Sequence, residues 1–168
     1  MVIGDYFEES DFNKIKEVFR KWYSLNADLR SLGGRGMNVP DVISEALYCY
    51  YFDAVRTNGV GYSYDAINLK TSEGVQIKST SVSGDVTSFG PRSTWDKLFF
   101  LDFAPEGMVN GLVDIYEISA DISAIIMNKS KSETFADQQL QGRRPRFSIK
   151  KEIIAKFALQ PVKQISLL

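Results

Sequence analysis

Apolar residues recur with helical spacing in two segments of the first third of the chain. Residues 10–32 carry large apolar side chains at intervals of three and four, which predicts an amphipathic helix. Ser10 precedes this stripe and suits the helix N-cap. A second helix is predicted to begin at Pro40, which suits the first helical position, and to end near Arg56. The stripe of the first helix consists of Phe12, Ile15, Phe19, Trp22 and Leu25.

The segment SYDAINLKTSEGVQIKSTS predicts two strands joined by a turn. Val75 and Ile77 alternate with Gln76 and Lys78, so the apolar pair and the polar pair face opposite sides of a strand. A Ser-Glu-Gly sequence supplies the turn to the preceding strand. A hairpin of this length brings Asp65 beside Gln76 and Lys78, and so places an acid, an amide and an amine at one point.

Two further strands and two helices are predicted later in the chain. Residues 98–103 are nearly all apolar, as in a strand covered on both faces, and a hairpin turn joins them to a strand over residues 112–118. Residues 120–127 and 149–158 are expected to be helical, and a loop is expected around Gly59. Helices, then strands, then helices indicate an α/β (α+β) fold with a central mixed β-sheet flanked by helices.

The composition is that of a globular protein and predicts one domain over residues 1–168. With 44% hydrophobic residues the chain can bury a core, but no apolar run is long enough to cross a bilayer. The N-terminus MVIGDYFEES lacks the basic-then-apolar pattern of a secretion signal. The one cysteine, Cys49, is expected to be a small buried apolar residue. We therefore expect a soluble, cytoplasmic protein.

Histidine is absent, and its absence limits the possible chemistry more than any other feature of the composition. Ser-His-Asp and Cys-His catalysis are excluded, as are zinc sites with histidine ligands and nucleases with a histidine base or nucleophile. A protein of this composition that cuts phosphodiesters must rely on carboxylates, lysine and a hard metal ion. The net charge of −1 neither supports nor excludes a nucleic-acid partner.

Asp65, Gln76 and Lys78 therefore form a first candidate site, suited to metal-dependent phosphodiester hydrolysis. Asp65 would hold Mg²⁺, while Lys78 would orient or deprotonate water and offset the developing negative charge. Glu45, within the second predicted helix, could supply a further carboxylate, and Gln76 a weaker, neutral ligand. The same pattern also fits an exposed strand beside an exposed helical carboxylate, with no catalytic role.

The second candidate is residues 138–146, which we call the basic segment. From residue 141 to residue 163, seven lysines and arginines face one glutamate, a local charge of +6. Arginines flanked by glutamines can read guanine and adenine edges in a major groove, and lysines can contact phosphates. A solvated basic face is the alternative. The residues expected to contact DNA are Gln138, Gln141, Arg143, Arg144 and Arg146.

A third candidate follows the hairpin, in the sequence DVTSFGPRSTWD. Its hydroxyls and glycine could approach a phosphate backbone closely, with Thr87, Ser88 and Arg92 facing DNA while the aromatic residues anchor the segment in the core. An ordinary surface loop is the alternative. Arg35 and Asn38, ahead of the second predicted helix, are candidates of the same kind.

Taken in order, these motifs resemble small type II restriction endonucleases of the PD-(D/E)XK superfamily. The resemblance extends from about Arg35 to Phe147 and rests on NVPDVISE with Glu45, SYDAI with Asp65, VQIKSTS with Gln76 and Lys78, DVTSFGPRSTWDKLFFLDF and RRPRF. It implies a mixed sheet flanked by helices and Mg²⁺-dependent cleavage of double-stranded DNA, with Mn²⁺ able to substitute. It also implies a homodimer that acts on a short palindrome, with Asp65 as the metal-binding acid and Lys78 as the catalytic lysine.

Gln76 departs from the family pattern, which usually has Glu or Asp there, and this leaves the number of metal ions open. Two other functions remain compatible with the sequence. A repair or junction-processing nuclease of the same superfamily would prefer mismatched or branched DNA, and a catalytically silent sequence-specific DNA-binding module would carry Gln76 as a relic of lost activity. A restriction enzyme further implies a cognate DNA methyltransferase in the same prokaryotic cell, without direct contact.

Overall fold

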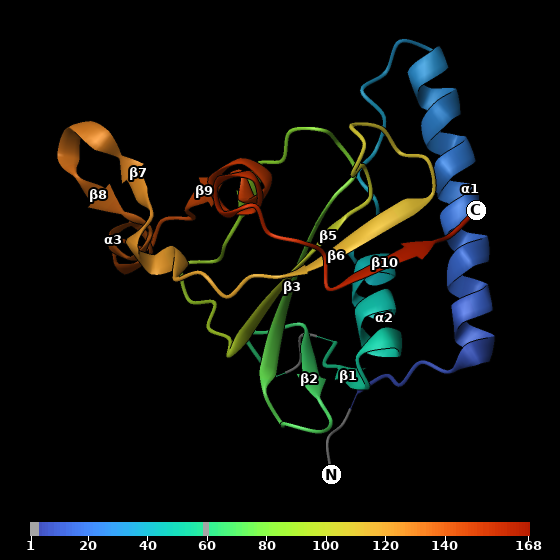
Figure 1. Cartoon of the computed structure of the whole chain (residues 1–168), viewed down its shortest axis with the longest axis horizontal. Coiled ribbons are helices and arrows are strands. Elements are labelled where there is room, and N and C mark those ends of the chain that lie inside the picture. Colours follow the sequence, from blue (N-terminus) through green and yellow to red (C-terminus); the bar gives the residue numbers. More distant parts are fainter. Residues whose placement is uncertain (1–3, 59–60) are drawn as a thin grey trace.

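The computed structural model describes residues 4–58 and 61–168, and its central feature is a six-stranded sheet (Figure 1). The strands of this sheet are β1 (Ala54–Arg56), β2 (Ala66–Asn68), β3 (Gly74–Thr80), β5 (Lys97–Asp102), β6 (Leu112–Glu117) and β10 (Lys163–Ser166). They lie in the order β1-β2-β3-β5-β6-β10, with β3 and β5 parallel and the other neighbours antiparallel. The expected mixed sheet is confirmed. Gly59 of the predicted loop and the first three residues of the chain lie outside the described residues.

Helix α1 (Glu9–Ser31) confirms the first predicted helix with two corrections. Ser10 is not the N-cap, because Glu8 takes that position and forms a capping box with Asp11. Three of the five apolar stripe residues are buried and Phe12 packs against their core, but Leu25 is 48% exposed because the buried face of the helix continues at Asn26 instead.

Helix α2 (Asp41–Tyr51) confirms the second predicted helix but ends earlier than Arg56. Asp53 adopts a left-handed φ of 49°, and the chain turns there into β1. Pro40 is the N-cap residue rather than the first helical residue. Both helices lie on the same side of the sheet (Figure 1).

The predicted hairpin is confirmed as β2 and β3, which pair with Ala66 opposite Val75. The predicted strands over residues 98–103 and 112–118 correspond to β5 and β6 and are likewise confirmed. Because β2 pairs with β3 only at its first two residues, no described strand pairs with that edge of β3 beyond Val75. This free edge of β3 positions the site described below.

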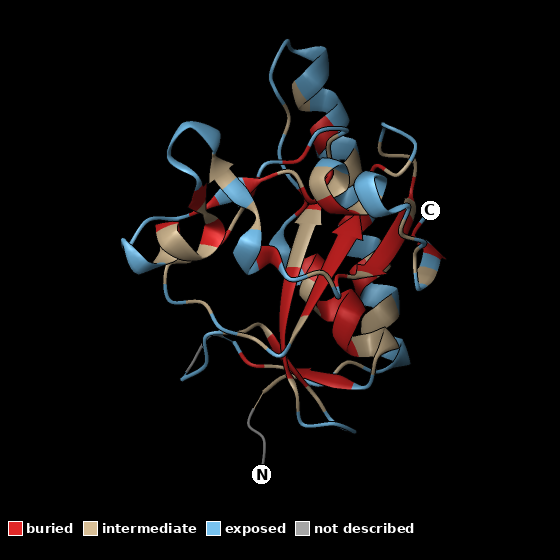
Figure 2. Ribbon diagram, turned by 60° about the vertical axis from the view of Figure 1, so that its left-hand side comes forward, coloured by how far each residue is buried: buried red, intermediate tan, exposed pale blue. Residues whose placement is uncertain are grey.

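The sheet separates two apolar cores, which explains why its central strands are buried on both faces (Figure 2). On β5, Phe99 and Leu101 belong to the core shared with α1 and α2, while Leu98 and Phe100 belong to a second core on the other face. Phe89 lies at the centre of that second core and is fully buried.

The chain after β6 differs most from prediction. A helix is expected over residues 120–127, but the structure has one 3₁₀ turn, η1 (Ile122–Ala124), and then β7 (Ile126–Asn128). A short apolar run fits a strand as well as a helix. Here Ile122 is buried in the second core, and Ile125 and Met127 pack against that core while Ile126 between them is exposed. The helix expected over residues 149–158 is confirmed as η3 (Lys150–Ala155), which has π-type turns.

The remaining elements build a lobe that projects from the sheet on the side away from α1 (Figure 1). They are η2 (Lys129–Lys131), β8 (Glu133–Thr134) paired with β7, α3 (Phe135–Leu140), and β9 (Arg146–Phe147) paired with β4 (Thr87–Ser88). Cys49 is buried, as predicted. No helix among the described residues combines the length and the apolar character needed to span a membrane.

Candidate active site at the free edge of β3

Asp65 lies directly before β2, where that strand leaves β3. Its backbone N–H donates to the Val75 carbonyl at 2.9 Å, and its Oδ2 accepts the backbone N–H of Ile77 at 2.7 Å. The carboxylate thus replaces the strand carbonyl that this edge of β3 lacks. Burial raises the pKa of Asp65, while the Ile77 hydrogen bond and the charge of Lys78 act in the opposite direction.

Gln76 contacts Asp65, as the hairpin predicts. Its side-chain amide donates to Asp65 Oδ2, and the residue is only 5% exposed. The alternative of an exposed strand is therefore wrong for Gln76. The residue is not part of the wall of the cavity described next, so its role as a metal ligand stays a prediction.

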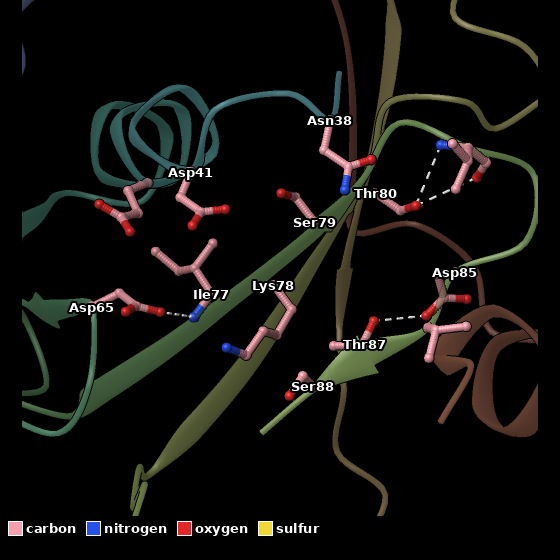
Figure 3. A pocket seen from close by; sticks show the side chains of 13 residues that line it. Asn38, Asp41, Asp65, Ile77, Lys78, Ser79, Thr80, Asp85, Thr87 and Ser88 are labelled. Atoms are coloured by element: carbon pink, nitrogen blue, oxygen red, sulfur yellow. Dashed lines mark hydrogen bonds between the residues drawn. The ribbon is translucent and has the colours of Figure 1, made fainter. Parts of the chain in front are cut away.

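A cavity of about 220 Å³ opens beside this edge of β3 (Figure 3). Its walls come from the start of α2 with the loop before it, from β3 with Asp65, and from the chain leading into β4. Figure 3 shows Asp41, Asp65 and Lys78 around one side of this space and Thr87 and Ser88 on the other. The predicted site residues that meet here are Asn38, Glu45, Asp65, Lys78, Thr87 and Ser88.

Glu45 reaches the cavity from α2, so the alternative of a merely exposed helical residue is wrong. Burial raises the pKa of Glu45 to about 7, and the charge of Asp65 adds to the effect. Arg56 counteracts it, since its guanidinium lies 3.7 Å from the Glu45 carboxylate. Arg56 is itself held by Asp5 through a contact of 2.6 Å.

Asp41 is a carboxylate in the cavity that the sequence argument missed. It lies one helical turn before Glu45 on α2, and its charge raises the pKa of both Glu45 and Asp65. The spacing of four residues on a predicted helix was the available signal, because residues four apart share a helix face.

The segment before β4 is anchored by Asp85, which is 4% exposed. Asp85 accepts hydrogen bonds from the Thr87 hydroxyl at 2.7 Å, the Ser148 hydroxyl at 2.6 Å and the backbone N–H groups of Ile149 and Lys150 at 2.8 and 3.1 Å. It therefore caps the helix at η3 from a distant part of the chain. The Thr87 hydroxyl is turned to Asp85 rather than to solvent, which corrects the expectation that it faces DNA.

Ser88 has a different environment from that of Thr87. Its Oγ lines the cavity and is buried, yet has no hydrogen-bond partner among the described residues. A buried hydroxyl without a partner costs roughly 1–3 kcal/mol, so a ligand or water that supplies the partner recovers this free energy.

The basic segment is organised around Glu133, a residue the sequence argument did not single out. Arg143 Nη1 contacts both Glu133 oxygens at 2.9 and 3.0 Å, and Gln138 Nε2 donates to Glu133 at 2.8 Å. Gln138 is 7% exposed, so its amide supports Glu133 instead of facing DNA as expected. Gln141 accepts a bond from Arg143 at 3.1 Å.

Arg144 and Arg146 are exposed and make no ion pair within residues 4–58 and 61–168. Arg146 lies opposite Ser88 in the β4–β9 pair, so the basic segment is bonded directly to the cavity wall. Arg35 and Arg92 are exposed but do not line the cavity, whereas Asn38 does.

The oxygen donors of the cavity fit a hard divalent cation. In the part of the chain that the structure describes, no three acidic or cysteine side chains converge as in a preformed all-protein metal site. Mg²⁺ does not require such a site, because one or two carboxylates, waters and substrate phosphates usually bind it. Asp65 and Glu45 would supply the two carboxylates, and Asp65 Oδ2 is already oriented by its hydrogen bonds.

A mixed sheet with an acid and a lysine at the free edge of a central hairpin defines a nuclease of the restriction-endonuclease-like class. Residues 7–156 match the Bsp6I restriction endonuclease family. The chain is also 34% identical over 170 residues to the type II restriction enzyme Bsp6I of Bacillus sp. (strain RFL6), covering 99% of this chain and 95% of that enzyme. The chain therefore belongs to the Bsp6I restriction endonuclease family and is a site-specific endodeoxyribonuclease. No solved structure matches it.

Proposed function

We propose that this enzyme, as a single nuclease domain over residues 1–168, cuts both DNA strands at a short palindromic site with Mg²⁺, for which Mn²⁺ can substitute. The observation that supports this most is the meeting of Asp65, Glu45 and Lys78 at one cavity, although Glu45 comes from a separate helix. The oxygen-rich wall suits a hydrated cation and a phosphate better than an apolar ligand.

Each of these side chains has a separate task in the proposed reaction. Bound Mg²⁺ would lower the pKa of the attacking water and offset charge on the phosphate. Asp65 and Glu45 would hold the ion, and the contacts of Ile77 and Arg56 orient these two carboxylates. Lys78 lines the same cavity, where its ammonium would orient the water and stabilise the negative charge that develops on the phosphate.

DNA would lie across the cavity and the basic segment. Arg144 and Arg146 have no ion-pair partner among the described residues, so their guanidinium groups could bind phosphates or base edges, while Glu133 presents Arg143 in a fixed orientation. Arg35, Asn38, Arg92 and Gln141 are exposed and would make further contacts to the backbone. The Ser88 hydroxyl in the cavity wall would meet a phosphate oxygen.

A palindromic site implies two copies of the chain, because a two-fold symmetric sequence is matched by a two-fold symmetric dimer. We therefore propose a homodimer. A cognate DNA methyltransferase would protect host DNA without contacting the enzyme, and restriction of incoming DNA would place both proteins in the cytoplasm of a prokaryotic cell.

The test is incubation of the purified protein with plasmid DNA and Mg²⁺, followed by sequencing of the ends. Discrete fragments with identical ends at a symmetric site are expected, and EDTA should stop the reaction. Random nicking, or cleavage confined to branched and mismatched DNA in a substrate panel, would instead support a repair or junction-processing nuclease. Sequence-specific binding without cleavage in Mg²⁺ or Mn²⁺ would support a silent DNA-binding module.

Gln76→Glu is expected to destabilise the metal-free protein and to tighten metal binding. The new carboxylate would replace the amide that donates to Asp65 Oδ2, which puts two acids in direct contact. We expect the free energy of unfolding in EDTA to fall by about 1–3 kcal/mol, and Mg²⁺ to recover most of this loss. Thermal unfolding with and without Mg²⁺ measures both effects. An equal change in Tm with and without Mg²⁺ would show that residue 76 does not bind the metal.

Cleavage is expected to increase with pH through about 7, where Glu45 loses its proton. A protonated carboxyl does not bind the metal, so Mg²⁺ affinity increases over the same range. Metal-free stability changes in the opposite direction. The folded pKa of Glu45 lies above its ordinary value of 4.5, so its contribution is complete below pH 4.5 and is lost as the pH rises to about 7.

Glu45→Gln provides the control for this pH dependence. In EDTA, the stability of the parent should fall by on the order of 2 kcal/mol between about pH 5 and 8, measured by urea unfolding, while the variant should lose less. Parallel curves for the two proteins would show that Glu45 does not titrate near neutrality.

Replacing Arg144 and Arg146 together by glutamine is expected to weaken DNA binding in a salt-dependent manner. Each lost phosphate contact reduces the slope of log affinity against log salt by about 0.9. The affinity for the cleavage site should be measured in Ca²⁺ at several salt concentrations. Replacing Lys129 and Lys131 of η2 together by glutamine removes the same charge outside the cavity wall and serves as the control. If the slope of log affinity against log salt is the same as in the parent, neither arginine contacts a phosphate.

A further inference from the structure

The ammonium group of Lys78 lies over an aromatic ring and not beside a carboxylate. Its Nζ is 5.5 Å from the centroid of the Phe89 ring. Asp65 and Glu45 line the same cavity, yet Lys78 makes no ion pair with any described residue. Such a position needs a physical cause, because a flexible ammonium near carboxylates is expected to pair with one of them.

The Phe89 ring is held in place by other aromatic rings on several sides. It stacks on Phe147 with centroids 5.6 Å apart and an interplanar angle of 10°, and it meets Phe135 edge to face at 5.3 Å. Trp95 packs at 5.5 Å. Phe89 is fully buried, and its backbone N–H donates to the Pro145 carbonyl at 3.0 Å. The ring therefore cannot turn away from Lys78 without disturbing the second core.

An aromatic face attracts a cation without carrying a net charge. That property is useful in this cavity because the proposed reaction places two requirements on the Lys78 ammonium. The ammonium must stay close to the phosphate, but an ion pair with Asp65 or Glu45 would occupy the carboxylates that the metal needs. A neutral ring satisfies both requirements, whereas a further carboxylate in its place would attract metal as well as lysine.

We propose that Phe89 is a positioning residue, whose ring holds the Lys78 ammonium near the phosphate site and away from the metal-binding carboxylates. This inference rests on the proposed role of Lys78 in cleavage. The backbone N–H of Phe89 donates to the Pro145 carbonyl in the basic segment, so DNA contact at that segment would act on the residue whose ring holds the lysine.

The test replaces Phe89 by 4-fluoro-, 3,5-difluoro- and pentafluorophenylalanine. These rings keep nearly the same shape but attract a cation progressively less. The logarithm of the single-turnover cleavage rate should fall steadily along the series, reaching a loss of about 3- to 30-fold with the pentafluoro ring. The affinity for the cleavage site in Ca²⁺ should not change, because the fold and the DNA-binding surface remain intact.

Phe135 is the matched control, since it packs on Phe89 in the same core and does not lie beneath Lys78. The same fluorinated series at Phe135 should leave the rate unchanged. A flat series at Phe89, an increase in rate, or an equal decrease at both positions overturns the proposal. An active parent with a flat series contradicts only the role of Phe89, whereas normal cleavage by Lys78→Ala contradicts the proposed role of the lysine itself.

A second measurement needs neither metal nor DNA. Protons of a lysine that lies over a ring face resonate upfield, so the Lys78 Hε signal in the metal-free protein should stand apart from those of the other lysines. Lys78→Arg identifies the signal by its disappearance. Phe89→Leu should return the signal to the ordinary range while Phe135→Leu does not; an ordinary Lys78 signal in the parent overturns the proposal even if the protein does not cleave DNA.

Discussion

Asp65→Ala is expected to lower the single-turnover cleavage rate by roughly three orders of magnitude or more. The change removes one of the two carboxylates that would hold the metal, and it leaves the Ile77 N–H at the edge of β3 without its acceptor. Affinity for the cleavage site without metal should be equal or higher, because a negative charge near a phosphate is lost. Gel shift in EDTA and cleavage in Mg²⁺ separate the two effects.

Asp65→Asn distinguishes chemistry from folding in this experiment. The asparagine oxygen can still accept the Ile77 N–H, and the buried charge disappears. Since burial raises the pKa of Asp65, ionisation of the native residue costs stability at neutral pH, and the asparagine variant should unfold at an equal or higher temperature than the parent. We expect this stable variant to be as inactive as the alanine variant. Substantial cleavage by Asp65→Asn would show that the carboxylate does not hold the metal.

Asp85→Ala is expected to be the most destabilising single change in the site region. It removes the acceptor of the Thr87 hydroxyl and of the two backbone N–H groups that begin the helix at η3. Asp85 is only 4% exposed, so water cannot readily replace the lost carboxylate. Each buried donor left without a partner costs about 1–3 kcal/mol, so we expect a total loss of about 3–5 kcal/mol and a fall of about 10 °C in Tm.

Asp121→Ala is the matched control for Asp85→Ala. Asp121 also caps a helical turn, by accepting the Ser123 N–H at 2.9 Å, but it is exposed and serves only η1. Its loss should cost less than about 1 kcal/mol. Calorimetry of both variants measures the difference. A small effect at Asp85, comparable to that at Asp121, would mean that the segment before β4 holds its position without this anchor.

The parts of the fold that the sequence predicted well are those that depend on local pattern. The period of three to four in α1 and the period of two in β3 each reflect which side of that element faces a core. A continuous apolar run identified β5 as a strand that is buried on both faces. The predicted helix over residues 120–127 is wrong because its apolar run is short and fits a strand as well as a helix. In the folded chain Ile125 and Met127 pack against the second core while Ile126 is exposed, which is the alternation of a strand.

The same distinction between short-range and long-range contacts applies to the candidate site. Asp65 and Gln76 meet because a hairpin joins them, and a hairpin register is a short-range property. Glu133 escaped notice because a single acid between β7 and α3 has no pattern of its own; only the folded lobe brings Arg143 and Gln138 to it. The expectation that Gln138 and Thr87 face DNA is wrong because each side chain donates to a buried carboxylate of the protein. The Gln138 amide donates to Glu133, and the Thr87 hydroxyl donates to Asp85.

The sequence by itself therefore determined the chemistry that is possible: no histidine, an acid and a lysine brought together by a hairpin, and a cationic segment. The tertiary structure decided which residues share the cavity. Glu45 and Asp41 arrive on α2, Ser88 arrives on β4, and the Phe89 ring lies beneath Lys78. These contacts join segments that are distant along the chain, and their geometry depends on how two cores pack against opposite faces of one sheet. Periodicity reports which side of an element is buried, but it carries no information about which other element covers that side.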